Sequence, residues 1–239
     1  MEENGRSKGE SLKILGIDEA GRGAVIGPLV ICGLVIDERK EDDLRKLGVK
    51  DSKELTPKKR VELVPEIERL GDTVILSTPA CKIDANRRKG VNLNQIEAIK
   101  MAEIINIVNP DKVIIDCPSY NSNKFRDYLW SKIDNKNVEL VCENFADKNY
   151  PVVSGASVVA KVHRDKKIRE LEKKIGEPIG VGYPHHDATI KFLKKLAKEN
   201  NGKMPRYVRH TWDTVEQIVK PYKQRRILSF LERIAKRST

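Results

Sequence analysis

Short apolar runs that end in acidic or turn residues alternate with segments of helical periodicity, and this alternation constrains the fold more than any other feature. The runs that predict strands are Leu12–Asp18, Pro28–Ile36, Thr73–Thr78, Lys112–Asp116 and Val138–Cys142. Helix starts lie between them, at Thr56-Pro57 and at Asn92 followed by Gln95. From Val152 onward helices should dominate. The sequence therefore predicts an α/β sheet with a helical C-terminal portion.

Composition narrows the class of protein. The 239 residues, 39% of them hydrophobic and 34% charged, are typical of one folded domain with a small appendage. The formal charge of +11 indicates a polyanionic partner such as nucleic acid, although a Lys- and Glu-rich thermophile surface explains it equally well. A polar start and the lack of any membrane-length apolar run predict a cytoplasmic protein that binds no membrane. The four cysteines form no CxxC pair, so we expect neither zinc nor disulfides.

Four acidic residues stand where neighbouring strands of the predicted sheet end. Asp18 and Glu19 close the first strand, Asp116 closes the strand KVIID, and Asp147 follows the last strand. Hydrolysis of a phosphodiester needs an activated water and relief of charge on phosphorus, which two bound divalent ions supply. Mg²⁺ prefers carboxylate oxygens and water. If these strands are adjacent, their acids converge into a metal site at one edge of the sheet.

The glycine-rich segment GRGAVIG follows the first acidic pair directly. Alternation along a strand sends Asp18 and Glu19 to opposite faces, so we expect the strand to turn there, eased by Gly21 and Gly23. Two other interpretations stay open. The acids could be solvated strand ends. The segment could be a dinucleotide loop, but its third glycine comes one position late and the acids would repel a pyrophosphate.

Taken together, several motifs resemble type 2 ribonucleases H, in their archaeal form. They are DEAGRG at Asp18–Gly23, DSKEL at Asp51–Leu55, the acid of IID at Asp116, ADKNYPVVSGASVVAKVHRD at Ala146–Asp165 and, more loosely, RYVRHTW at Arg206–Trp212. The resemblance runs from about Ile14 to Tyr183. The combination of DEAGRG with the SGAS block is specific, because chance would rarely produce both.

The resemblance implies a ribonuclease H-like fold, with a central mixed five-stranded sheet flanked by helices. It implies a catalytic domain over residues 1–200 and a helical extension over 201–239 that contributes to substrate binding. Asp18, Glu19, Asp116 and Asp147 would be the catalytic acids that bind two Mg²⁺ or Mn²⁺ ions. The implied activity is endonucleolytic cutting of RNA/DNA hybrids and of duplex DNA that contains single ribonucleotides, leaving 5′-phosphate and 3′-hydroxyl ends.

Substrate contacts follow from the same resemblance and from the chemistry of the groups. Gly21, Arg22 and Gly23 are suited to detect the 2′-hydroxyl through backbone groups. The resemblance places Tyr183 against the following deoxyribose, although an aromatic anchor for its own loop is the alternative. Lys53 would pair with a phosphate. We assign Arg206 and Arg209, with His210, to contact with the duplex backbone.

Three residues near these motifs receive other roles. Asp165 shares a predicted helix with Arg164 and Lys161, so we expect a structural salt bridge rather than a metal ligand. His185 and His186 depart from the pattern expected around Tyr183. Because no Cys or third His is spaced for zinc, we expect both to be exposed to solvent.

The C-terminal segment approximates a motif with which DNA-processing proteins bind a sliding clamp. Its residues are Gln224, Ile227, Phe230 and Leu231, with Leu231 in place of the usual second aromatic residue. Ile227, Phe230, Leu231 and Ile234 also form an ordinary amphipathic stripe that would pack within the protein. Both interpretations stay open.

Two competing functions share some of these features. A junction resolvase on a similar sheet would also gather acids at strand ends, but it should not respond to a 2′-hydroxyl. A non-catalytic nucleic-acid-binding protein would bind without metal and cut nothing. We expect a monomeric enzyme.

Overall fold

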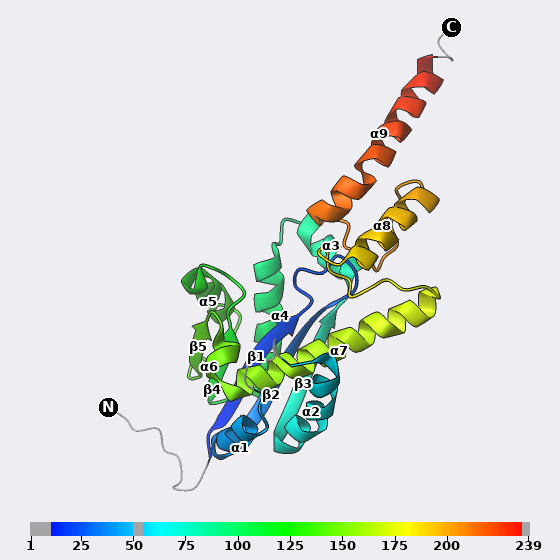
Figure 1. Cartoon of the computed structure of the whole chain (residues 1–239). Helices are drawn as coiled ribbons and strands as arrows, with labels where there is room; N and C mark the ends of the chain where they lie inside the picture. Colours follow the sequence, from blue (N-terminus) through cyan, green and yellow to red (C-terminus); the bar gives the residue numbers. More distant parts are fainter. Residues whose placement is uncertain (1–10, 50–54, 236–239) are drawn as a thin grey trace. The chain divides into compact units, whose positions relative to one another are not determined.

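The structure is a computed structural model whose described residues are 11–49 and 55–235; the side chains of residues 226–235 are outside the description. Its strands are β1 (Lys13–Ala20), β2 (Leu29–Asp37), β3 (Gly71–Thr78), β4 (Lys112–Asp116) and β5 (Glu139–Glu143). Its helices are the 3₁₀ turn η1 (Glu38–Lys40), α1 (Glu41–Lys46), α2 (Pro57–Leu70), α3 (Ala80–Arg88), α4 (Leu93–Val108), α5 (Ser122–Trp130), α6 (Ala146–Asn149), α7 (Pro151–Ile175), α8 (Asp187–Glu199) and α9 (Asp213–Ala235). Figure 1 labels the strands and the α-helices.

The described residues form two compact units. The first takes in the described parts of Met1–Ala20, Val30–Ser77 and Asn92–His163, and it contains nearly all of the sheet. The second takes in those of Gly21–Leu29, Thr78–Val91 and Arg164–Thr239. The boundary expected near residue 200 falls inside the second unit, so the division into a catalytic domain and an extension stays a prediction.

The sheet of the first unit has the order β3-β2-β1-β4-β5. β1 pairs antiparallel with β2 and parallel with β4, and β4 pairs parallel with β5. The sheet is therefore mixed, as expected. The central strands β1 and β4 are apolar and buried because helices cover both of their faces. Parallel β1 and β4 end at the same edge of the sheet, and this places their terminal residues together.

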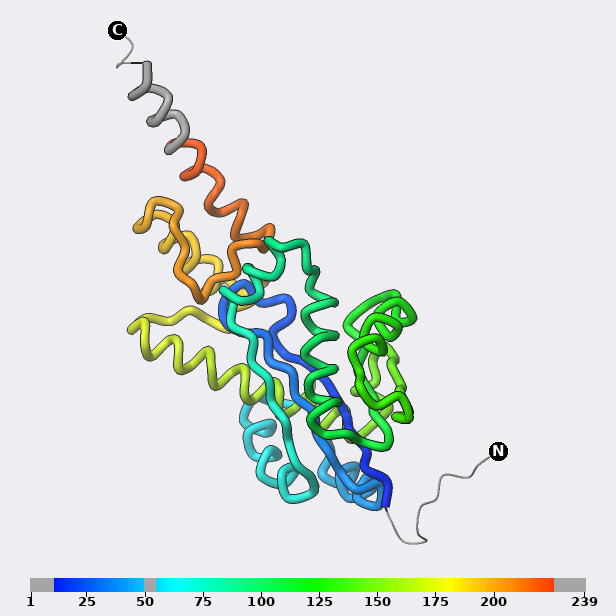
Figure 2. The backbone as a smooth tube through the Cα atoms, turned by 180° about the vertical axis from the view of Figure 1, so that it is seen from behind, coloured from blue at the N-terminus to red at the C-terminus, as the bar shows by residue number. Residues whose placement is uncertain are grey.

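Helices cover the two faces of this sheet at close range. On one face, a Cβ on Gly16 would lie 2.5 Å from the backbone of Val152, so only glycine lets α7 approach β1 this closely (Figure 1). On the other face, a Cβ on Gly33 would lie 2.6 Å from Ile104 of α4, the helix seen in front of the sheet in Figure 2. The register pairs Gly16 with Leu34 and Ile17 with Gly33, so residues alternate between the α7 face and the α4 face.

The second unit has its own apolar core. Phe192 and Leu193 of α8 pack there with Ile168 of α7 and with Val25 and Ile26 of the segment after β1. Ile26 also forms an isolated antiparallel bridge with Val208. The segment after β1 is therefore built into this core and is not a free surface loop.

Local sequence patterns, such as helix caps and apolar runs, predicted most of the helices and strands. The Thr56 side chain accepts from Lys59 N at 3.2 Å, and Asn92 and Gln95 form the expected capping box at the start of α4. Three short helices, α1, α3 and α6, were not predicted, because runs of four to nine residues carry little periodicity. Within the described part of the chain, no helix combines the length and apolar character needed to cross a membrane.

Candidate active site

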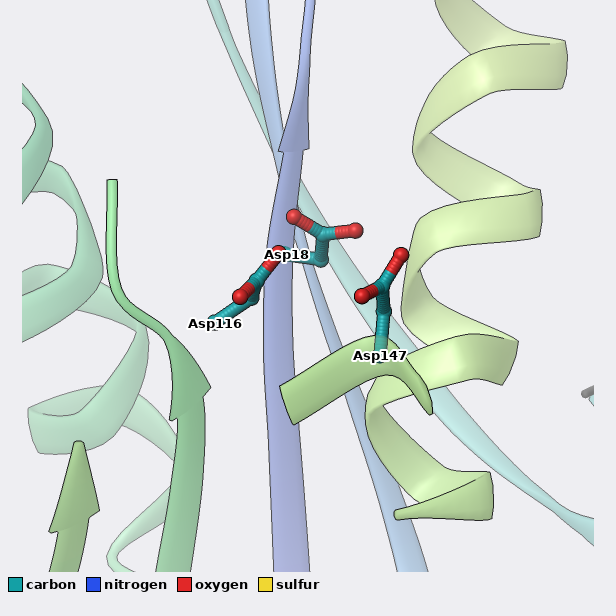
Figure 3. Close-up of side chains that lie close together, drawn as sticks. All are labelled: Asp18, Asp116 and Asp147. Atoms are coloured by element: carbon teal, nitrogen blue, oxygen red, sulfur yellow. The ribbon is translucent and has the colours of Figure 1, made fainter. Parts of the chain in front are cut away.

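Three of the predicted acids meet at one edge of the sheet. Asp18 lies near the end of β1, Asp116 ends β4, and Asp147 lies in the short helix α6. Oxygen atoms of the three carboxylates all lie within 4.8 Å of one another, and Figure 3 shows the side chains turned toward a common point. The pairing of Ile17 with Ile115 in the parallel β1–β4 ladder brings Asp18 and Asp116 to this edge. The prediction that these acids converge is confirmed.

The site concentrates negative charge where water is scarce. Asp18 is 5% exposed and Asp147 is 2% exposed. Burial, and then the negative charge of Asp116, raise the pKa of Asp18 to about 7. A hydrogen bond from Ser157 and the charge of Lys161 lower this pKa and only partly offset the rise. Such a cluster is favourable for a bound cation, which would stabilise all three carboxylates in their charged form.

Asp116 also holds the start of α6, the helix that contains Asp147. The backbone N–H of Ala146 donates to Asp116 Oδ1 at 3.1 Å, at the start of α6. Phe145, just before that helix, has a φ of 62°, in the left-handed region, so the chain bends sharply before Asp147. Asp116 thus holds the bend that carries Asp147 to the site.

Glu19, the fourth predicted ligand, is outside this group of three. β1 does not turn between Asp18 and Glu19 as expected; it runs regularly to Ala20, with Asp18 opposite Cys32 and Ala20 opposite Val30. The expected turn is therefore wrong. Asp18 shares the α7 face with Gly16, whereas alternation directs Glu19 to the face that α4 covers. That Glu19 binds metal stays a prediction.

The glycine-rich loop after β1 has a precise internal structure in the second unit. Gly21 has a φ of +87°, and a Cβ there would lie 2.6 Å from the Pro28 carbonyl oxygen, so the position requires glycine. Its N–H donates to the Tyr183 hydroxyl at 3.1 Å. The Arg164 guanidinium lies 4.5 Å from the Tyr183 ring centroid. Gly21 and Tyr183, predicted from separate motifs, are therefore in direct contact.

The predicted contact of Arg209 with a duplex backbone is wrong. Its side chain is 0% exposed, so it is not available to a duplex backbone as proposed from the sequence. Its guanidinium donates to the carbonyl oxygens of Gly21 at 2.6 Å, Arg22 at 2.8 Å and Gly27 at 3.2 Å. A planar fork of donors suits several carbonyls at once, which explains why an arginine occupies this buried position. Arg209 shapes the glycine loop from within.

Comparison with known proteins agrees with this geometry. The family model described as Ribonuclease HII matches residues 15–215. The chain belongs to the ribonuclease HII family. The curated ribonuclease HII of Methanosphaera stadtmanae is 43% identical over 208 residues, which cover 87% of this chain and 95% of that protein.

Two solved structures extend the comparison. The ribonuclease H2 of Pyrococcus horikoshii OT3 superposes with a TM-score of 0.80 and 36% identity, covering 89% of this chain and 99% of that one. A chain from the PCNA:RNase HII complex of Archaeoglobus fulgidus has a TM-score of 0.77 and 37% identity, covering 84% and 96%. The ribonuclease H-like fold predicted from the motifs is confirmed. The chain is a ribonuclease H, a hydrolase that acts on RNA/DNA hybrids.

Sequence reasoning missed several polar partners of the family motifs. Ser157 and Lys161 of α7 flank the acids, and Lys161 Nζ donates to Ser157 Oγ at 2.8 Å. Their i,i+4 spacing in the SGASVVAK segment was a signal that could have placed them on one side of a helix. Asp84 and Arg164 are also buried in the second unit. Asp84 lies in none of the motifs, because its partners are far away in sequence, whereas Arg164 lies in the motif Ala146–Asp165 and was assigned only to an ion pair with Asp165.

The remaining candidate residues divide into those the structure describes and those it does not. Arg206 is exposed, and the backbone of Arg22 is held as described above. Lys53 lies outside the described residues. Asp165 forms the expected ion pair with Arg164, with Nη1 to Oδ1 at 3.2 Å.

The two histidines differ from each other. His185 is exposed, as expected, and its ring stacks against Tyr183 with centroids 5.5 Å apart. The expected exposure to solvent holds only in part for His186, which is partly exposed and whose Nδ1 is buried. His186 immediately precedes α8, so its backbone is fixed by the helix start.

The clamp-like segment lies on α9. Gln224 is exposed, and the helix continues through Ile227, Phe230 and Leu231, whose side chains lie outside the description. The structure therefore leaves both interpretations of this segment open.

Proposed function

We propose that this ribonuclease H cuts the RNA strand of RNA/DNA hybrids and also cuts 5′ of single ribonucleotides embedded in duplex DNA, leaving 5′-phosphate and 3′-hydroxyl ends. One observation carries the proposal: three buried or half-buried carboxylates share a space 4.8 Å across at the end of β1 and β4. Such a cluster is costly unless cations neutralise it. Membership of the family supplies the substrate class, and the cut at single ribonucleotides is the finer part of the proposal.

The donor set fits two Mg²⁺ or Mn²⁺ ions. Asp18, Asp116 and Asp147 offer only oxygen ligands, the kind that these hard cations prefer, and Glu19 would supply a fourth carboxylate. When bound, the ions would activate water for in-line attack and neutralise charge that develops on the phosphate. The protein holds Asp18 and Asp116 on two paired strands and Asp147 on α6, and this placement fixes the geometry before substrate arrives.

Lys161 and Ser157 support the charged form of Asp18 in this proposal. They lie beside Asp18, where their charge and hydrogen bonding favour its carboxylate form. The pair would keep Asp18 ready to bind a cation without occupying its oxygens permanently. A lysine this close also favours the approach of the phosphate backbone.

Recognition of ribose is assigned to the loop of Gly21, Arg22 and Gly23. A Cβ on Gly23 would meet nothing within 4 Å, so this part of the loop leaves room for a substrate backbone. Tyr183 contacts Gly21 and is partly exposed, as needed to pack on the deoxyribose that follows. Arg206, which is exposed, and Lys53 would contact phosphates.

One assay separates the proposal from its competitors. A branched DNA junction and three labelled duplexes are incubated with and without Mg²⁺; the duplexes are all-DNA, DNA with one ribonucleotide, and an RNA/DNA hybrid. We expect metal-dependent cutting of the last two only, with a single cut 5′ of the ribonucleotide. Cutting of a branched DNA junction without any ribonucleotide would favour a resolvase. Binding without cutting in any metal would favour a non-catalytic protein.

We also propose a sliding clamp as a partner of α9, through Gln224, Ile227, Phe230 and Leu231. The support is the motif itself and the related ribonuclease HII of Archaeoglobus fulgidus, whose structure is of a complex with PCNA. Binding of the full-length protein to an archaeal clamp is measured by calorimetry. Loss of binding in the double variant Ile227→Ala with Phe230→Ala supports the idea, and unchanged binding removes it.

A further inference from the structure

A buried carboxylate in the second unit has no role in the site described so far. Asp84 of α3 is 2% exposed. Its Oδ2 accepts from the backbone N–H of His210 at 2.8 Å. Its Oδ1 accepts from the backbone N–H of Thr211 at 3.1 Å and from the Thr211 hydroxyl at 2.7 Å. One side chain thus fixes two consecutive residues that are more than 120 positions away in sequence.

The segment that Asp84 holds begins right after Arg209. Arg209 donates to the carbonyl oxygens of Gly21 and Arg22, so its side chain sets the path of the glycine loop. On the other side of the segment, Trp212 has the guanidinium of Arg209 4.8 Å from its ring centroid and that of Arg87 at 4.7 Å. Asp84 is therefore linked to the loop through its hydrogen bonds to His210 and Thr211, the short segment that joins them to Arg209, and the hydrogen bonds of Arg209.

Electrostatics favours the same link. Burial lowers the pKa of Arg209 to about 9, which still leaves the guanidinium charged at neutral pH. Electrostatic interactions with Tyr183 and then with the carboxylate of Asp84 raise this pKa, whereas the charges of Arg164 and Arg87 lower it. A buried guanidinium near two others needs a nearby negative charge, and Asp84 supplies one.

We propose that Asp84 is a positioning residue for ribose recognition: through Thr211 and Arg209 it fixes the main chain of Gly21 and Arg22. The inference rests on the proposed function, in which this loop senses the 2′-hydroxyl. Hydrogen bonds to a 2′-hydroxyl are sensitive to small displacements of their partners. Loss of the Asp84 contacts should therefore weaken ribose discrimination more than it weakens general duplex binding.

Two pairs of variants test the proposal in the full-length protein. In Asp84→Asn, an amide N–H₂ must face either the His210 N–H or the Thr211 donors, so at least one contact becomes unfavourable. Thr211→Val removes only the hydroxyl at nearly constant volume, whereas Thr211→Ser keeps the hydroxyl and serves as the rescue. Glu199→Gln, which alters an exposed acid paired with Lys195 in the same unit, is the control.

The readout is a ratio: the dissociation constant of the all-DNA duplex divided by that of the same duplex with one 2′-hydroxyl. Both constants are measured in EDTA so that no cutting occurs. We expect Asp84→Asn and Thr211→Val each to lower this ratio by roughly three- to tenfold, with little change in binding of the all-DNA duplex. Thr211→Ser and Glu199→Gln should match the unmodified protein. The double variant Asp84→Asn with Thr211→Val should be no worse than Asp84→Asn alone, because both act through one contact.

The alternatives give different results. A merely structural role would lower the fraction of active protein, or weaken binding of both duplexes equally, and would leave the ratio unchanged; either result overturns the proposal. If Asp84→Asn does not fold, the comparison of Thr211→Val with Thr211→Ser decides alone. If the unmodified protein itself shows no preference for the ribonucleotide, the assignment of ribose sensing to the loop fails, and the present inference fails with it.

Discussion

The acid cluster (Asp18, Asp116 and Asp147) and the glycine loop after β1 both contain buried charges. The charges of the first repel one another, whereas the charge of the second is compensated by groups of the protein. At the acid cluster, three carboxylates face one another and the nearby Lys161 offsets only part of their repulsion. At the loop, the buried guanidinium of Arg209 donates to three backbone carbonyls, and the charge of Asp84 favours its charged form. The first region needs a ligand to complete it, whereas the second is satisfied by the protein itself. Substitution of an acid in the first region should therefore have its largest effect on catalysis, whereas substitution of Arg209 in the second should have its largest effect on the stability of the fold.

The largest expected effect is on catalysis at the acid cluster. Asp116→Asn keeps the side-chain volume and can still accept from Ala146 N–H, but it removes a charge from the proposed metal site. We expect kcat on a hybrid to fall by more than about a hundredfold, because loss of an outer-shell partner of a metal already costs 10–100-fold. The melting temperature should change little. Full activity in this variant would refute the metal assignment, and Glu139→Gln, in an exposed ion pair with Lys112, is the control.

At the loop, the expected effect is on stability. Arg209→Ala leaves three carbonyl oxygens without their donor and opens a cavity in the second unit. We expect the free energy of unfolding to fall by about 3 kcal/mol, measured by denaturant titration. Arg206→Ala, at an exposed position of the same segment, should change it by less than about 0.5 kcal/mol. Equal effects of the two substitutions would contradict the distinction between the buried and the exposed arginine.

Stability of the metal-free protein should reveal the strain at the acid cluster. The folded pKa of Asp18, about 7, lies above the ordinary value of 3.8. Protonated Asp18 therefore favours the folded state below about pH 4, and this contribution is lost as pH rises through 7. In EDTA, Asp18→Asn should gain roughly 4 kcal/mol in the free energy of unfolding relative to the unmodified protein between pH 4 and pH 8, because each unit of pKa rise corresponds to about 1.4 kcal/mol. A difference that does not vary with pH would argue against a raised pKa.

The smallest expected effect is the difference in stability between alanine substitutions at two glycines of the loop. Gly21→Ala places a Cβ against the Pro28 carbonyl at a positive φ, so we expect a loss of about 1–2 kcal/mol in the free energy of unfolding. Gly23→Ala meets no neighbour and should leave stability almost unchanged. If Gly23→Ala nevertheless weakens binding of a ribonucleotide-containing duplex, the open side of the loop is the side that substrate approaches.

Much of the architecture could be predicted from local patterns. The helix starts at Thr56 and Asn92 follow from side-chain capping, and the strands that contain Asp18 and Asp116 follow from their short apolar runs, which the structure buries. The motifs that include Asp18, Asp116 and Asp147 also identified the chemistry. These signals are short-range, because each depends on residues within a few positions of one another.

Other features depended on contacts between distant segments. Continuation of β1 to Ala20 is decided by its pairing with β2, and alternation along this strand directs Glu19 to the opposite face from Asp18. The exposed-looking motif RYVRHTW contains Arg209, which only the tertiary structure shows to be buried beneath a loop 182 to 188 residues earlier. A basic residue in a polar segment has the same sequence pattern whether it faces water or carbonyl groups.

For this protein, the sequence by itself determined the fold class, the family and three carboxylates of the proposed metal site. Those conclusions rest on periodicity, capping and motif spacing, which the chain carries locally. The tertiary structure decided which charges are left for a ligand and which are neutralised internally. That division depends on burial and on partners more than a hundred residues apart, such as Asp84 with Thr211, and neither property is encoded in any single stretch of sequence.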